Sequence, residues 1–171
     1  MRSRWLSPAS GGSESPTLEI RRAQPDGAND LSRIAFAAKA HWGYPDHWME
    51  RWREDLAITP EYVHQNEVHV AIVEGGPAGF YALAGKGRRI ELGHLWVLPE
   101  RMGEGVGRAL FEHALRTAAS LGAGVVEIEA DPNAEGFYRR MGASRVGEIV
   151  YEIDGRERVL PLLAMYVQAP S

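Results

Sequence analysis

The sequence predicts an α/β fold in which a mixed, mostly antiparallel sheet carries helices on both faces. Residues 68–98 form three strand patterns separated by short glycine-containing turns, which is typical of an antiparallel meander. Residues 105–121 then carry apolar side chains at helical spacing between two strand patterns, and such a strand-helix-strand unit makes its two strands parallel. Near the C-terminus, Asp154-Gly155 separates two further strand patterns and indicates a two-residue hairpin.

Ahead of the meander, the pattern predicts one strand and three helices. The first elements expected are a strand from Leu18 to Ala23, a turn at 24–27, a helix from about Leu31 to the break at Gly43, and a helix after Pro45 that carries Trp48, Trp52 and Leu56 at helical spacing. Thr59-Pro60-Glu61 has the composition of a helix start, because a threonine hydroxyl can cap a helix and proline favours its first position. We expect the third helix to begin there.

From residue 68 onward the pattern is mainly one of strands. The expected elements are strands at Val68–Val73, Gly79–Leu83, Arg89–Leu98 and Gly124–Ala130, a helix from Gly105 to about Leu121, a short helix from about Ala134 to Met141, and the two hairpin strands. The long helix is expected to bury a face made of Val106, Leu110, Ala114, Leu115, Ala118 and Leu121. Pro161 lies inside the last strand pattern, and because proline cannot donate to a ladder we expect an edge or a bulge there.

The composition is that of one small globular domain. The chain has 171 residues, of which 44% are hydrophobic, and we expect a single domain from residue 17 to 171. Residues 1–16 are rich in Ser, Gly and Pro and lack the apolar stretch of a signal peptide, so we expect a flexible leader. No segment approaches the ~20 apolar residues that span a bilayer. The formal net charge of −4 gives no reason to bind nucleic acid or an anionic membrane, so small ligands are the expected partners.

The side-chain inventory excludes several kinds of chemistry. The chain has no cysteine, which excludes disulfides, thiolate metal sites and a cysteine nucleophile and fits a cytoplasmic location. The six histidines show no metal-ligand spacing, so we expect no metal.

A glycine-rich segment follows the strand that ends near Leu98. Gly103, Gly105 and Gly107 alternate immediately before the long helix, and such glycines allow backbone N–H groups and the helix dipole to meet a phosphate. A dinucleotide fingerprint would require glycine where the chain has Arg108 or Leu110, and the chain contains no Walker sequence. The segment therefore predicts a pyrophosphate site of another kind.

This segment resembles the acyl-CoA-binding motif of the GNAT family of N-acetyltransferases. The resemblance lies in Val97-Leu98-Pro99-Glu100, the three alternating glycines, and the alanine- and leucine-rich helix after them. Met102 stands where the family has arginine or glutamine, and the arginine lies one position earlier, at Arg101. We therefore expect backbone N–H groups to hold the pyrophosphate without an arginine or glutamine side chain at position 102.

A second segment is similar to another motif of the same family. Asn133-Ala134, Phe137-Tyr138 and Gly142-Ala143 follow one another at the family's spacing. With the order of strands and helices, the resemblance covers roughly residues 18 to 166. It implies a GNAT-like sheet whose parallel strand pair is splayed to admit the cofactor.

The resemblance implies an acyl-CoA-dependent N-acyltransferase, most simply one that transfers acetyl from acetyl-CoA to a primary amine by direct attack in a ternary complex. The pantetheine arm would lie along Leu95 to Val97, where the Val97 N–H would polarise the thioester carbonyl, and the pyrophosphate would lie over the N–H groups of residues 103–108. The residues expected to contact the cofactor are Leu95, Trp96, Val97, Met102, Gly103, Glu104, Gly105, Val106, Gly107, Arg108, Asn133, Phe137 and Tyr138. Asn133 also suits the N-cap of its helix.

The expected catalytic residues are an acid and a base. The resemblance makes Tyr138 the group that protonates, or hydrogen-bonds to, the departing thiolate, although a packed aromatic is the structural alternative. Glu91 and His94 lie on the strand where the family often keeps the residue that accepts the amine proton. Strand side chains alternate, so these two point to opposite faces, and the sequence leaves open which one is the base.

The acceptor remains open at this level. His41, Trp42 and Tyr44 lie at a helix-helix turn where family members form an acceptor wall, and aromatic faces can hold a cationic amine. Trp48 and Trp52 are better explained as helix core. The alternatives are a non-catalytic acyl-CoA sensor and a protein-lysine or N-terminal acetyltransferase. A homodimer through the last strands is also possible.

Overall fold

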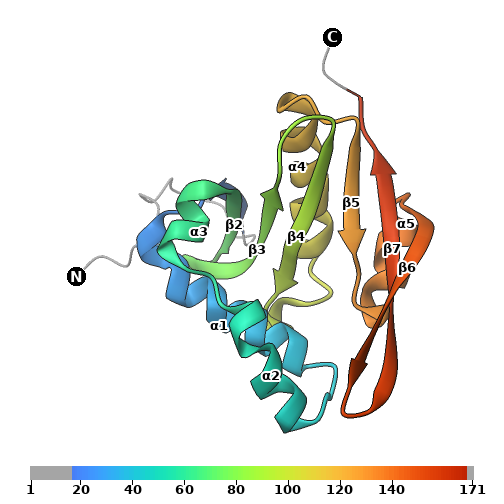
Figure 1. Cartoon of the computed structure of the whole chain (residues 1–171). Helices are drawn as coiled ribbons and strands as arrows, with labels where there is room; N and C mark the ends of the chain where they lie inside the picture. Colours follow the sequence, from blue (N-terminus) through green and yellow to red (C-terminus); the bar gives the residue numbers. More distant parts are fainter. Residues whose placement is uncertain (1–16, 169–171) are drawn as a thin grey trace. The chain divides into compact units, whose positions relative to one another are not determined.

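The computed structural model describes residues 17–168 (Figure 1). Within these residues seven strands form one sheet in the order β1-β2-β3-β4-β5-β7-β6. The strands are β1 (Leu18–Arg22), β2 (Glu67–Val73), β3 (Gly76–Ala84), β4 (Arg89–Val97), β5 (Val125–Glu129), β6 (Ser144–Ile153) and β7 (Arg156–Tyr166). The helices are α1 (Ala28–Ala40), α2 (Asp46–Leu56), α3 (Pro60–Gln65), α4 (Val106–Ser120) and α5 (Glu135–Arg140). The order of elements and the mixed α/β class confirm the prediction.

The chain divides into two compact units. The first contains the residues up to Ala82 together with His94–Phe111, and the second contains Leu83–Gly93 and the residues from Glu112 onward. The predicted leader, residues 1–16, lies outside the described residues. Among the residues that the structure describes, no helix has the length and apolar character needed to cross a membrane.

The first unit has a core between α1, α2, α3 and the strands β2 and β3. The face of α1 that enters it consists of Leu31, Ile34 and Ala35, which recur at helical spacing. α3 begins where the sequence predicted, because the Thr59 hydroxyl accepts a hydrogen bond of 3.0 Å from the backbone N–H of Tyr62. α1 begins at Ala28 rather than near Leu31, since a 3₁₀ turn at Pro25–Gly27 leads directly into it.

Helices cover both faces of β3 within the first unit. Phe80 and Ala82 belong to the core that includes α1. Gly79 faces the opposite side of β3. A Cβ added to it would lie 3.1 Å from the Cδ1 of Leu110 on α4. The same Cβ would be 2.6 Å from the backbone oxygen of Trp96 on β4. Gly79 therefore allows the backbones of β3 and β4 to approach closely beside the start of α4.

We expect Gly79→Ala to destabilise the protein by about 1–3 kcal/mol, because the new methyl group can be accommodated only by moving the Trp96 backbone. Chemical denaturation gives the free energy of unfolding. Gly76→Ala is the matched control, because Gly76 lies on the same strand and an added Cβ there meets no atom within 4 Å. Equal stability of the two variants would contradict the packing argument.

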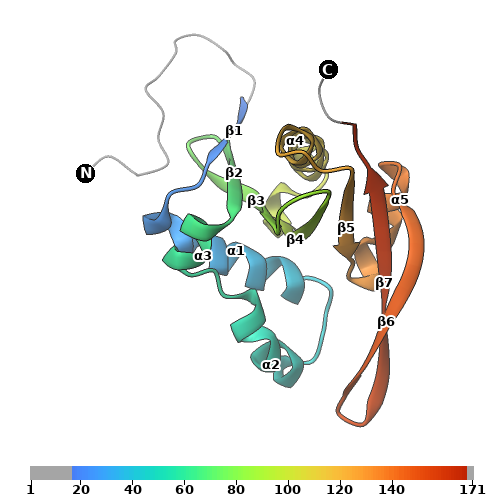
Figure 2. The same cartoon turned by 45° about the horizontal axis from the view of Figure 1, so that its top comes forward.

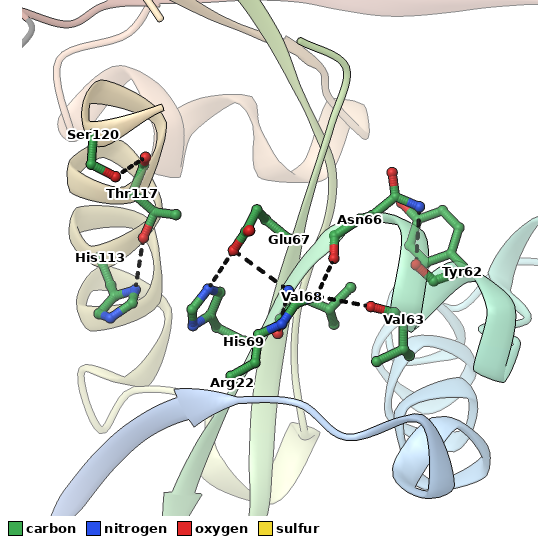
Figure 3. A network of polar contacts seen from close by, with 10 residues as sticks. All are labelled: Arg22, Tyr62, Val63, Asn66, Glu67, Val68, His69, His113, Thr117 and Ser120. Carbon is green, nitrogen blue, oxygen red and sulfur yellow. Dashed lines mark hydrogen bonds and ion pairs between the residues drawn. The ribbon is translucent and has the colours of Figure 1, made fainter. Parts of the chain in front are cut away.

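Arg22 ties β1 to the end of α3 in the first unit (Figure 3). Its guanidinium donates to the backbone oxygens of Asn66 at 2.6 Å, Val63 at 3.0 Å and Val68 at 3.3 Å. Glu67 accepts from the same guanidinium at 3.5 Å and contacts the ring of His69 at 3.1 Å. These bonds satisfy carbonyl groups at the helix C-terminus, so Arg22 acts as a structural cap.

The second unit contains the parallel strand pair and the C-terminal hairpin, whose strands lie side by side in Figure 2. The parallel ladder joins Arg89–Glu91 of β4 to 125–127 of β5, and it ends before either strand does. β7 then pairs antiparallel with both β5 and β6. The hairpin turn has Asp154 at φ 53° and Gly155 at φ 72°, as a type I′ turn requires.

The structure corrects the expectation for Pro161. Its strand is not at the edge, because β7 lies between β5 and β6. The Pro161 carbonyl accepts a hydrogen bond of 3.0 Å from the N–H of Ala130, which lies just past the end of β5 at Glu129. The Pro161 nitrogen, which has no hydrogen to donate, therefore lies beyond the end of the β5 ladder. A register irregularity does occur nearby, on β6 between Arg145 and Gly147.

The buried face of α4 also differs from the prediction at one end. Leu121 is 48% exposed because the helix ends at Ser120 and the chain turns at Gly122, whereas Phe111 is fully buried. The other predicted positions are buried or half-buried, so the helix period itself was predicted correctly.

Candidate active site

The loop between β4 and α4, called the cradle loop below, exposes its backbone at two glycines. Gly103 and Gly105 adopt φ values of 82° and 83°, which side chains of L-residues rarely tolerate. A Cβ added at either glycine would meet no atom within 4 Å, so this surface of the loop is bare backbone. The Gly105 carbonyl accepts from the N–H of Ala109 at 3.0 Å, which makes Gly105 the residue at which the helical bonding of α4 begins. The N–H groups of the next residues therefore belong to the helix N-terminus, where anions bind.

Arg101 does not supply the polar side chain that the family motif has at the position of Met102. Its guanidinium donates to the Glu74 carboxylate at 2.9 Å and lies 3.6 Å from Glu104. Glu74 lies in the turn between β2 and β3, with φ 51°. Arg101 thus fastens the cradle loop to that turn, and the half-buried Met102 carries no charge.

His94 faces the core of the first unit from β4. Its ring lies 5.9 Å from that of Phe80 and 5.7 Å from that of Tyr62. The indole N–H of Trp96 donates to its Nδ1 at 2.9 Å. Burial lowers the pKa of His94 from 6.5 to about 4, so the ring is neutral at pH 7. Because Nδ1 accepts, the ring proton is on Nε2.

Leu95 and Val97 alternate with His94 and Trp96 along β4, and both are half-buried. After them, the N–H of Leu98 donates to the Ala78 carbonyl on β3 at 2.8 Å, which holds the end of β4 where the cradle loop begins. The predicted alternation of faces is confirmed by the burial pattern of β4, in which Glu91 is exposed and its neighbours Ile90 and Leu92 are buried.

Glu91 belongs to the second unit and is the register partner of Glu127 on β5. Although Glu91 as a residue is exposed, partial desolvation of its carboxyl group and the nearby carboxylates of Glu129 and Glu127 raise its pKa above that of an ordinary glutamate. Arg89 forms an ion pair with Glu127 at 3.0 Å, so one cation offsets part of this negative charge. Glu91 is therefore a stronger base than an isolated glutamate.

The Asn133 segment follows β5 in the second unit. Asp131, rather than Asn133, caps the 3₁₀ turn Pro132–Ala134 that leads into α5, because its carboxylate accepts from the Asn133 backbone N–H at 2.8 Å. The cap role expected of Asn133 was therefore wrong. Tyr138 is 6% exposed, and burial together with the charge of Asp131 raises its pKa above the ordinary value. The phenol stays protonated at physiological pH, and Phe137 packs against its ring at 5.2 Å.

The expected acceptor wall lies in the first unit, around the turn after α1. His41 forms the C-terminal cap of α1, and Trp42 is 41% exposed. Tyr44 packs edge-on against Trp52 at 5.0 Å, and the ammonium of Lys39 lies 5.2 Å from the Tyr44 ring centre and 4.4 Å from that of Trp52. The aromatic cluster therefore already contacts one cation of the protein itself.

The predicted site residues thus fall into two groups, one in each unit. The first unit contains His41, Trp42, Tyr44, His94, Leu95, Trp96, Val97, Met102, Gly103, Glu104, Gly105, Val106, Gly107 and Arg108, and the second contains Glu91, Asn133, Phe137 and Tyr138. Sequence reasoning missed Asp131, although Asp-Pro-Asn before a helix is a capping signal. It also missed Arg158, which pairs with Asp131, because nothing local in the sequence links residues 27 positions apart.

The mixed sheet with one parallel strand pair and the glycine loop at the start of α4 are features expected of the class predicted from the sequence, a GNAT-like acyltransferase. A family model described as an acetyltransferase (GNAT) domain matches residues 64–142. The peptidyl-lysine N-acetyltransferase YjaB of Escherichia coli K12 is 30% identical over 155 residues, which cover 89% of this chain and 99% of that protein. The chain belongs to the GNAT family, and it is an acyl-CoA-dependent N-acetyltransferase.

Solved structures share the fold. A GCN5-related N-acetyltransferase from Rhodopseudomonas palustris superposes with a TM-score of 0.71 at 21% identity, covering 93% of this chain and 100% of that chain. The PaiA N-acetyltransferase of Thermoplasma acidophilum, solved in complex with coenzyme A, gives a TM-score of 0.69 at 18% identity, with 88% and 99% coverage. At these identities the likeness concerns the fold alone.

Proposed function

We propose that the protein transfers the acetyl group of acetyl-CoA to a primary amine by direct attack in a ternary complex, with a peptide lysine as the acceptor. The observation that carries the donor assignment is the exposed backbone at Gly103 and Gly105, where no protein atom lies within 4 Å of an added Cβ. The likeness to a peptidyl-lysine N-acetyltransferase supports the acceptor. A free lysine ammonium has a pKa near ~10.4, so the acceptor has to lose a proton before it attacks.

The cradle residues fit a coenzyme A pyrophosphate. Backbone N–H groups from Gly103 to Arg108 would hold it at the start of α4, and Asn133 would contact the pantetheine arm. When bound, acetyl-CoA supplies an activated thioester carbonyl. The Val97 N–H would polarise this carbonyl, and Leu95 and Trp96 would line the arm.

Glu91 is the better candidate for the base. A general base needs a free lone pair, and in His94 the Nδ1 lone pair accepts from Trp96 while Nε2 carries the proton. The raised pKa of Glu91 brings its basicity closer to that of the amine. We therefore assign removal of the amine proton to Glu91 and a structural role on β4 to His94.

The pH profile tests this assignment. Glu91 has to be deprotonated to act, so kcat/KM should fall as pH drops through its raised pKa, and Glu129→Gln should move this limb to lower pH by removing a neighbouring charge. Glu91→Gln should lower kcat by about 10²-fold or more. A limb near pH 4 that disappears in His94→Gln would assign the base to His94 instead.

Tyr138 would stabilise the leaving thiolate as a hydrogen-bond donor. Its raised pKa makes full proton transfer to a thiolate unfavourable, because a thiol has a pKa near ~8.5. The O–H group remains a donor over the whole working pH range, which is the property that a developing sulfur anion requires.

The proposal is tested by incubating the protein with acetyl-CoA and a panel of lysine peptides, N-terminal peptides and small amines, with mass-spectrometric detection of acetylated product. Acetylated lysine peptides with release of the thiol are the expected result. Acetyl-CoA binding without turnover of any acceptor would favour the sensor alternative. Cytoplasmic location, a homodimer and the lack of a metal remain predictions.

A further inference from the structure

A buried ion pair joins the loop after β5 to the last strand of the second unit. An Nη of Arg158 on β7 lies 3.3 Å from Oδ2 of Asp131, and the two side chains are 11% and 6% exposed. Charged side chains are rarely buried to this extent unless they are paired. The pair therefore fixes Asp131 from a second, distant element of the chain.

Asp131 in turn holds Asn133 at two points. Its Oδ1 accepts from the Asn133 backbone N–H at 2.8 Å and from the side-chain Nδ2 at 2.9 Å. A carboxylate only accepts hydrogen bonds, so the NH₂ end of the amide has to face Asp131. The carbonyl end of the same amide consequently faces away from Asp131, and Asn133 is exposed.

We propose that Arg158 and Asp131 are positioning residues for the cofactor, because together they hold the Asn133 amide with its carbonyl oxygen turned away from Asp131, the orientation in which it would accept a hydrogen bond from the ligand. The chemistry that fits this oxygen is an N–H donor, which the secondary amides of a pantetheine arm provide. The inference rests on the proposed function, since it requires that Asn133 contacts acetyl-CoA.

Through Arg158 and Asp131, strand β7 of the C-terminal hairpin would affect the binding of acetyl-CoA. Asn133 has an exposed side chain that would otherwise sample several rotamers, and fixing it before the ligand arrives lowers the entropic cost of binding. Removal of Arg158 leaves the Asp131 carboxylate buried without this cation, so its loop relaxes and the Asn133 amide loses its fixed direction.

The test measures acetyl-CoA affinity by calorimetry for Arg158→Gln, Asn133→Ala and the double variant. Each single variant is expected to raise the Kd about tenfold, and the double variant should be no weaker than Asn133→Ala, because Arg158 acts through Asn133. Arg158→Lys, which keeps the charge, should recover part of the affinity. In steady-state assays the KM for acetyl-CoA should rise while kcat at saturation and the acceptor KM stay unchanged.

Thermal unfolding separates positioning from folding. Arg22→Lys is the matched control, because Arg22 also anchors a loop, lies in the first unit and has no part in the proposed site. It should lower the Tm without changing acetyl-CoA affinity. Arg158→Gln that lowers only the Tm, or additive losses in the double variant, would overturn the inference, as would unaltered binding by Asn133→Ala. Failure of the unmodified protein to bind acetyl-CoA would instead overturn the proposed function.

Discussion

Gly105→Glu is expected to reduce acetyl-CoA affinity by more than 100-fold and to abolish turnover at ordinary donor concentrations. The residue has φ 83°, and the direction in which a side chain would project is empty of protein atoms within 4 Å. A glutamate there would fill the cradle and place a carboxylate at a helix N-terminus where the pyrophosphate is expected. Isothermal titration calorimetry with acetyl-CoA measures the effect directly.

The strain of a side chain at positive φ has to be separated from the loss of the site. Gly87→Glu provides this control, because Gly87 has φ 85° and an added Cβ there also meets no atom within 4 Å, but it lies in the turn between β3 and β4. The two variants should show similar Tm values. Unchanged acetyl-CoA binding by Gly105→Glu, with Gly87→Glu behaving alike, would remove the donor from this loop.

Tyr138→Phe is expected to lower kcat by about 10²-fold while leaving the Kd for acetyl-CoA nearly unchanged. The substitution removes one O–H group from a 6% exposed ring and keeps its packing against Phe137. An interaction made mainly with the departing sulfur acts in the transition state and not in the ground state, so kcat rather than binding should respond.

Thiol release measured under saturating acceptor and donor checks this result. Tyr81→Phe is the matched control, because Tyr81 is also fully buried but stacks on His69 within the first unit. It should leave kcat unchanged. Turnover by Tyr138→Phe at the rate of the unmodified enzyme would show that this tyrosine is only a packed aromatic. The raised pKa of Tyr138 also predicts that no basic limb of the pH profile below about pH 10 arises from this residue.

The sequence was sufficient for features that depend on local periodicity and turn chemistry. Helix α4, the meander and the Asp154-Gly155 hairpin all follow from residue spacing and from backbone preferences. Pro161 was misjudged because its effect depends on where β5 ends, which is a property of a neighbouring strand.

The residues of the candidate site could be named from sequence motifs, but the contacts among them could not. The glycine loop could be found because its chemistry is carried by the backbone conformation. Which nitrogen of His94 carries its proton depends on an indole two residues away, and the direction of the Asn133 amide depends on Asp131 and, through it, on Arg158. Such hydrogen bonds are set by tertiary packing, which short motifs do not encode.

The ion pair with Glu74 keeps the Arg101 guanidinium engaged within the protein. On the proposed function, the donor would then meet the backbone amides of the cradle loop and the uncharged side chain of Met102. The loop then presents nearly the same surface to the donor across the neutral range. On the proposed function, a change of rate with pH would therefore report the acceptor amine and the residue that deprotonates it, so a pH profile addresses the acceptor half of the reaction.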